Sequence, residues 1–163
     1  MQAMLFLDKI ISNIHDIRYR KVVEFVFLWQ DYNYWYNRKN PDIVNQRGMP
    51  LDAEQALRLS EDEIAINIYN MYKEDFVSSF ECIPASFDKK WVRDRLRCTG
   101  PYQQEVFYNR KSCDLKDFLA LVYQIRCNFI HGSKEGDDID IALIGWARDC
   151  LGVFLDAIDY MRD

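Results

Sequence analysis

Residues 114–132 read DLKDFLALVYQIRCNFIHG, and this stretch decides the fold class that the sequence predicts. On a helical wheel of about 100° per residue, its apolar side chains share one broad face: Leu115, Phe118, Leu119, Val122, Ile125 and Phe129. Asp114 can cap the start of such a helix, and Gly132 suits the left-handed residue that commonly follows a helix end. We therefore expect an amphipathic helix over residues 114–131.

The rest of the chain shows the same helical periodicity, interrupted by short breaks. Further helices are expected at residues 3–14, 16–38, 52–59, 61–80, 87–97 and 138–161. A capping box of Ser60 and Glu63 marks the start of the helix at 61–80. Residues 41–52 are expected to form a loop, and residues 101–113 fit either a loop or a short extended piece.

These elements predict an all-α fold, a helical bundle of about five helices. The helices at 114–131 and 138–161 are expected to pack antiparallel, because a short loop joins them. The sequence has only 6 Gly and 4 Pro, which leaves little room for a many-turned β fold. The length of 163 residues, with 49% hydrophobic and 15% aromatic residues, fits a single domain over 1–163 with a substantial core.

The apolar positions of the expected helices predict the buried side chains. They are Leu5, Ile10, Ile11 and Ile14 in the first, Val22, Phe25, Val26, Trp29 and Tyr36 in the second, Ile64, Ile68, Met71 and Tyr72 at 61–80, and Ile144, Ala147, Leu151, Phe154, Leu155 and Ile158 in the last. The aromatic series Trp29, Tyr32, Tyr34, Trp35 and Tyr36 fits core packing better than base stacking.

Composition bounds the environment and the partners. No run of apolar residues is long enough to span a membrane, and the first residues fit an amphipathic helix rather than a signal peptide. Five cysteines without a CxxC or His/Cys spacing argue against a disulfide framework or a structural metal and for a reducing cytoplasm. The net charge of -5 argues against strong non-specific binding of nucleic acid by the whole surface, but a local basic patch stays open.

Arg126 falls inside the apolar face of the helix at 114–131, where burying an unpaired charge is costly. It therefore needs a carboxylate, a partner subunit or a phosphate ligand. His131 lies about 140° further around a regular helix. The two side chains can converge if the helix ends or distorts near His131, or if two copies of the helix meet across a two-fold axis. Asn128 and His131 can be neighbours on a polar stripe with Asp117 and Gln124.

Spacing alone leaves ordinary structural roles open for the same residues. Arg126 can pair with an internal carboxylate, the carbonyls at a helix end can stabilise His131, and Asn128 can be a surface amide. His15, expected in a helix, has no motif around it. Cys127 fits helix packing better than nucleophilic chemistry.

The segment Arg126-Cys127-Asn128-Phe129-Ile130-His131-Gly132 resembles the signature of HEPN domains, an arginine followed a few residues later by a histidine, here as Arg-x4-His. The flanking Tyr123-Gln124-Ile125 and Gly132-Ser133-Lys134 are similar to that superfamily as well. So is the placement on a penultimate helix before a polar loop and a long apolar final helix. The resemblance covers residues 114–160, and it implies that the helical bundle is HEPN-like. Cys127 departs from it where many members carry a polar residue, and Ser133 departs where certain toxin–antitoxin members carry tyrosine.

The resemblance implies a homodimeric, metal-independent endoribonuclease that needs no cofactor. The ribose 2′-OH would attack the adjacent phosphorus, with His131 for proton transfer and Arg126 for the phosphate. Asn128 would orient His131 or contact the ribose, and Lys134 would be a further phosphate ligand. A toxin or defence effector with a cognate antitoxin, or a partner encoded by a neighbouring gene, fits this class.

The densest basic cluster is a second candidate for RNA contact. It contains Lys89, Lys90, Arg93, Arg95 and Arg97, with Trp91 between them; a solvated charged face is the alternative reading. Two other functions stay open for the chain: a non-catalytic HEPN module that binds nucleic acid or nucleotide, and a structural helical dimer. Arg126 buried against a carboxylate would favour the structural dimer.

Overall fold

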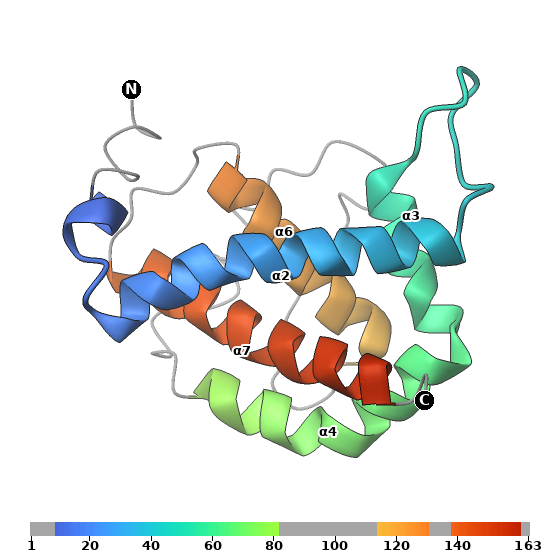
Figure 1. Cartoon of the computed structure of the whole chain (residues 1–163). Helices are drawn as coiled ribbons and strands as arrows, with labels where there is room; N and C mark the ends of the chain where they lie inside the picture. The colour runs from blue at the N-terminus through green and yellow to red at the C-terminus, as the bar shows by residue number, and fades with distance from the viewer. Residues whose placement is uncertain (1–8, 82–113, 131–137, 161–163) are drawn as a thin grey trace.

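Helices make up most of the part of the chain that the computed structural model describes, residues 9–81, 114–130 and 138–160 (Figure 1). They are α2 (Ile17–Lys39), α3 (Asp52–Arg58), the 3-10 helix η1 (Leu59–Glu61), α4 (Glu63–Glu81), α6 (Leu115–Ile130) and α7 (Asp138–Tyr160). Residues 9–12 are also helical. The described ranges contain no strand, only an isolated antiparallel bridge between Val44 and Pro50. The expected all-α class is therefore confirmed for these ranges, whereas the helix expected at 87–97 and the segment 101–113 lie outside them.

The helices α2, α6 and α7 form the centre of the arrangement. In Figure 1, α2 and α7 lie side by side and run in the same direction, α6 passes behind α2, and α4 lies along α7. α6 and α7 run in opposite directions, as expected for helices joined by a short loop. The most extensive contact of α7 is nevertheless with α2.

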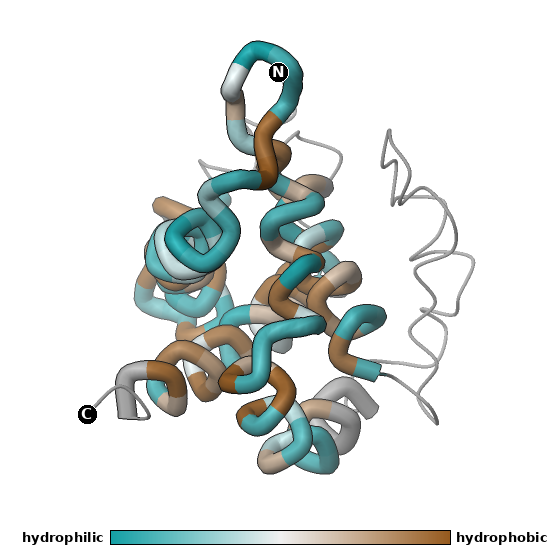
Figure 2. Tube along the Cα trace, turned by 90° about the vertical axis from the view of Figure 1, so that its right-hand side faces the viewer, coloured by the Kyte–Doolittle hydropathy of each residue, from teal (hydrophilic) through white to brown (hydrophobic). Residues whose placement is uncertain are grey.

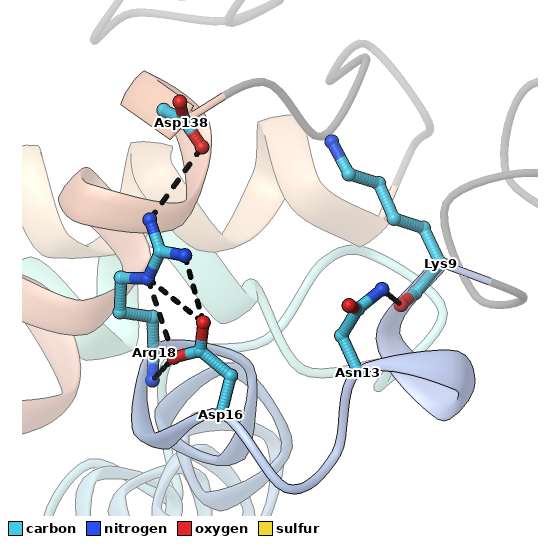
Figure 3. Close-up of polar contacts among 5 residues, drawn as sticks. All are labelled: Lys9, Asn13, Asp16, Arg18 and Asp138. Atoms are coloured by element: carbon cyan, nitrogen blue, oxygen red, sulfur yellow. Dashed lines mark hydrogen bonds and ion pairs between the residues drawn. The ribbon is translucent and has the colours of Figure 1, made fainter.

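Charged side chains connect the starts of α2 and α7 (Figure 3). Asp16 caps α2 by accepting a hydrogen bond from the Arg18 amide, and its carboxylate accepts a second one from Arg18 Nη2 at 2.7 Å. The same guanidinium reaches Asp138 in the first turn of α7 at 3.7 Å. Further along, Lys21 pairs with Asp149 at 2.5 Å. These ion pairs lie at the rim of the contact between α2 and α7.

Of the two caps expected at the starts of α4 and α6, one is confirmed and one is wrong. Asp114 caps α6 as expected, accepting from the Asp117 amide at 2.8 Å. The expected capping box with Ser60 is wrong: Ser60 lies in η1, and Asp62 caps α4 instead by accepting from the Ala65 amide at 3.1 Å. A 3-10 turn delays the helix start, so the cap moves two positions along the chain.

Aromatic side chains of α2 form the centre of the core. Trp29, Tyr32, Trp35 and Tyr36 are buried, in contact with Tyr123 of α6 and Phe154 of α7. The core-packing interpretation is thus confirmed for these four, while Tyr34 is exposed, with the Arg38 guanidinium over its ring. In Figure 2 the hydrophobic segments gather where the helices face one another.

Most of the expected core positions are confirmed, including Ile10, Val22, Ile68 and the buried side of α7. Four are wrong, since these side chains are exposed: Ile11, Ile14, Val26 and Met71. Helical spacing predicts only which side of a helix is apolar, whereas the neighbouring helices decide how much of that side is covered. Leu5 lies outside the described ranges. Within those ranges, no helix is long and apolar enough to cross a membrane.

Candidate functional site

The candidate site lies where α6 crosses α2, at the side chain of Arg126. Its guanidinium carbon lies 5.5 Å from the centroid of the Trp29 ring, a cation–π contact. Its Nη1 donates to Cys127 Sγ at 3.9 Å, which is a weak interaction because thiols are poor acceptors. Its Nε is buried without a hydrogen-bond partner. Within the described ranges no carboxylate pairs with Arg126, so the internal ion pair that spacing left open is not found there.

A pocket of about 280 Å³ opens beside this guanidinium. Its walls come from α2 and from the last two turns of α6: Phe25, Val26, Trp29, Gln30, Asn33, Arg126, Phe129 and Ile130. Arg126 is the one charged side chain in this lining, and two amides and five apolar side chains make up the rest. The pocket can therefore hold a small, partly apolar group next to a positive charge.

The Asp52 carboxylate lies behind one wall of the pocket and accepts hydrogen bonds from two helices. Its Oδ1 accepts from the Tyr36 hydroxyl at 2.5 Å and from Asn33 Nδ2 at 2.8 Å, and its Oδ2 accepts from the Tyr123 hydroxyl at 3.0 Å. Asn33 Nδ2 also donates to the Tyr36 hydroxyl. We call these four residues, Asn33, Tyr36, Asp52 and Tyr123, the Asp52 network. It joins the first turn of α3 to α2 and α6.

The electrostatics of the Asp52 network keep both tyrosines protonated. Burial, then the hydrogen bond to Asp52, raises the pKa of Tyr36 well above its usual value. Burial and the neighbouring Cys127 and Asp52 raise the pKa of Tyr123 in the same way, which Arg126 partly offsets. The two hydroxyls are therefore fixed donors to the carboxylate.

Cys127 does not have the surroundings of a nucleophile. Burial raises the pKa of its thiol, and the hydrogen bond from Arg126 only partly opposes this. A thiol with a raised pKa contains little thiolate at neutral pH. The packing interpretation of Cys127 agrees with this environment.

Of the residues expected at the site, Arg126 is the one whose side chain the structure describes. Asn128 lies in α6, but its side chain is outside the description, and so are His131, Lys134, Lys89, Lys90 and Arg93. Their predicted roles stay predictions. His15 was expected in a helix and instead lies in an exposed turn before α2, a correction that leaves it without a place in the site.

Sequence reasoning missed Asp52 and Asn33. Asp52 lies 19 positions after Asn33 and 71 before Tyr123, so helical spacing contains no signal that would join them. Gln124, expected on a polar stripe, is only 2% exposed. The surroundings of α6 therefore differ from those of a helix with one polar and one apolar face. Among the described residues, no group of three or more side chains could hold a metal ion.

Comparisons with known proteins add no relative. No protein-family model matches the sequence, no curated protein matches it, and no solved structure matches the fold.

Proposed function

We propose that this protein is a metal-independent endoribonuclease of the HEPN type, in which Arg126 binds the phosphate that is cleaved. One observation carries the proposal: the Arg126 guanidinium lines a pocket with its Nε buried and without a hydrogen-bond partner. Arg126 as a whole is half-buried, but a buried N–H without an acceptor is costly. A phosphate would supply the missing charge and acceptors, and the planar fork of an arginine matches phosphate oxygens.

The cleavage follows from the residues of the Arg-x4-His segment. The ribose 2′-OH loses its proton to a base and attacks the phosphorus, the bond to the 5′-oxygen breaks, and that oxygen takes up a proton. The products are a 2′,3′-cyclic phosphate and a 5′-OH. His131 is proposed for the proton transfer and Asn128 for its orientation or for contact with the ribose. Arg126 is proposed to stabilise the charge on phosphorus.

A homodimer is part of the proposal, because one chain contributes a single Arg126 and a single His131. A second copy would double both groups. The apolar side chains on several sides of α6 are not evidence for a dimer, because the helix buries them within one chain. Leu121, Tyr123 and Gln124 are all buried within one chain. Among the described residues of α6, Ile130 is 50% exposed, and a dimer contact near 126–134 would cover it.

The remaining basic residues are proposed to collect RNA. Lys134 would add a phosphate contact near His131, and Lys89, Lys90 and Arg93 would bind the backbone away from the cleaved bond. A toxin or defence effector controlled by an antitoxin is the cellular setting that fits such an enzyme.

Incubation of labelled RNA with the purified protein in EDTA tests the reaction. The wild-type protein should release products with a 2′,3′-cyclic phosphate, and His131→Ala should abolish cleavage. Arg126→Lys keeps the charge and loses the fork, so its cleavage rate should fall strongly. Lys89→Ala and Lys90→Ala should weaken RNA affinity and its salt dependence while cleavage persists.

A non-catalytic nucleotide-binding module is the second candidate, and the pocket beside Arg126 favours it. In the same RNA assay, a binding module would give a different result from a ribonuclease. RNA would bind in an Arg126-dependent manner, yet His131→Ala would change nothing and no cyclic phosphate would form.

A further inference from the structure

We propose that Trp29 of α2 is the positioning residue for Arg126. Its buried ring holds the guanidinium in place and uses none of the N–H groups that would bind a phosphate. The inference rests on the phosphate role proposed above, and it adds to the site a residue from a different helix, nearly a hundred positions before the Arg-x4-His segment.

The contacts of the Arg126 guanidinium leave most of its donors unused. Among the described residues it meets two groups, the Cys127 thiol at 3.9 Å and the Trp29 ring at 5.5 Å from the ring centroid. The thiol is a weak acceptor. A cation–π contact attracts the charge to the face of the ring, whereas a carboxylate would occupy the N–H fork itself. The ring therefore fixes the arginine and keeps its fork available for an anion.

The Trp29 ring can fix the arginine because neighbouring rings fix Trp29. It is only 5% exposed. Its neighbours lie at centroid distances of 5.2 Å for Tyr32, 5.7 Å for Tyr123, 6.1 Å for Phe25 and 6.3 Å for Tyr36. Three of these rings, those of the tyrosines, are inclined to it by 62–65°. A ring packed in this way has little freedom to change its rotamer, so it presents a constant surface to Arg126.

The Asp52 network fixes two of these neighbours in turn. The hydroxyls of Tyr36 and Tyr123 both donate to the Asp52 carboxylate, and those two rings pack on Trp29 from α2 and α6. The carboxylate therefore acts on Arg126 through the rings rather than through an ion pair.

An NMR titration with inorganic phosphate tests the positioning role. It follows the Nε–Hε cross-peak of Arg126, which Arg126→Lys identifies because lysine has no such group. In the wild-type protein the ring current of Trp29 should move this peak upfield, and phosphate should shift it further. In Trp29→Leu the peak should lose the upfield shift, and the affinity for phosphate should fall about tenfold, within the range of a cation–π contact.

Trp35→Leu is the matched control. Trp35 lies on the same helix and is 3% exposed, and its ring packs on Tyr32 and Phe154 rather than under Arg126. Its variant loses a buried indole as well, so urea denaturation should show a lower stability for both variants. The affinity for phosphate and the position of the Arg126 peak should stay at the wild-type values in Trp35→Leu.

Trp29→Phe covers the case in which Trp29→Leu does not fold. It keeps a ring in the core, but phenylalanine attracts a cation less strongly than tryptophan does. The Arg126 peak should stay upfield, and the affinity for phosphate should fall about threefold. Trp35→Phe, its control, should bind phosphate as the wild type does.

The outcomes separate this inference from the proposed function. Wild-type phosphate affinity in the folded Trp29 variants, or an equal loss in the Trp35 variants, overturns the positioning role even where RNA is cleaved. A loss confined to the Trp29 variants supports it even if the wild-type protein leaves RNA uncut. A wild-type Arg126 peak that does not respond to phosphate contradicts the phosphate role itself, and the inference fails with it.

Discussion

The Arg126 guanidinium lies over the Trp29 ring, 5.5 Å from guanidinium carbon to ring centroid, and this contact orients the arginine without neutralising its charge. A cation–π contact of this kind is worth about 0.5–2 kcal/mol. Arg126 is half-buried, and within the described ranges its guanidinium contacts the Trp29 ring and the Cys127 thiol rather than a carboxylate.

Replacing Arg126 with methionine separates a functional arginine from a structural one. Arg126→Met keeps the length of the side chain and removes the charge. The free energy of unfolding should stay within about 1 kcal/mol of the wild type or rise, whereas breaking a buried ion pair would lower it by about 3–5 kcal/mol. Urea denaturation measures the difference. A loss in the larger range would return Arg126 to a structural role.

The Asp52 network should contribute strongly to stability. Asp52→Ala leaves the Tyr36 and Tyr123 hydroxyls without their acceptor, and we expect the free energy of unfolding to fall by about 3 kcal/mol, from hydrogen bonds to a charged group worth about 1.5–3 kcal/mol each. Asp31→Ala, on an exposed position of α2, is the control and should change stability by less than about 0.5 kcal/mol. Equal effects of the two substitutions would show that the network does not stabilise the fold.

The two glycines of α7 that face α2 should tolerate alanine. A Cβ on Gly152 would meet Leu28 Cδ1 at 3.7 Å, and one on Gly145 would meet Lys21 Cδ at 3.7 Å, both ordinary van der Waals contacts. Alanine is favoured over glycine inside a helix by about 0.5–1 kcal/mol, so each substitution should raise the thermal midpoint. A lower midpoint for either variant would mean that α2 and α7 approach more closely than these distances indicate.

The cap of α2 should lose its charge only in strong acid. The hydrogen bonds from Arg18 hold the pKa of Asp16 at about 2, below its usual 3.8. Because the folded pKa is lowered, the contribution of Asp16 to stability is present above about pH 3.8 and is lost as the pH falls through about 2. An NMR titration of the Asp16 carboxyl should give its midpoint near the lower value, and Arg18→Ala should move the midpoint upward. A midpoint that Arg18→Ala leaves in place would contradict this origin of the shift.

The sequence by itself determined the helical class and most of the core. Helical periodicity and caps are local properties, readable from residues a few positions apart. For this reason α2, α6 and α7 begin and end within two residues of their expected bounds. The sequence also singled out Arg126, because a charged residue inside an apolar face contradicts the pattern around it.

Only the tertiary structure decided what surrounds Arg126. The Trp29 ring, the pocket and the Asp52 carboxylate reach this place from α2 and α3, dozens of positions away along the chain. Helical spacing gives the direction of a side chain on its own helix but not the neighbour that it meets. The fixed orientation of the Asn33 amide is the clearest case, because it depends on a carboxylate that helix packing alone brings within hydrogen-bond distance.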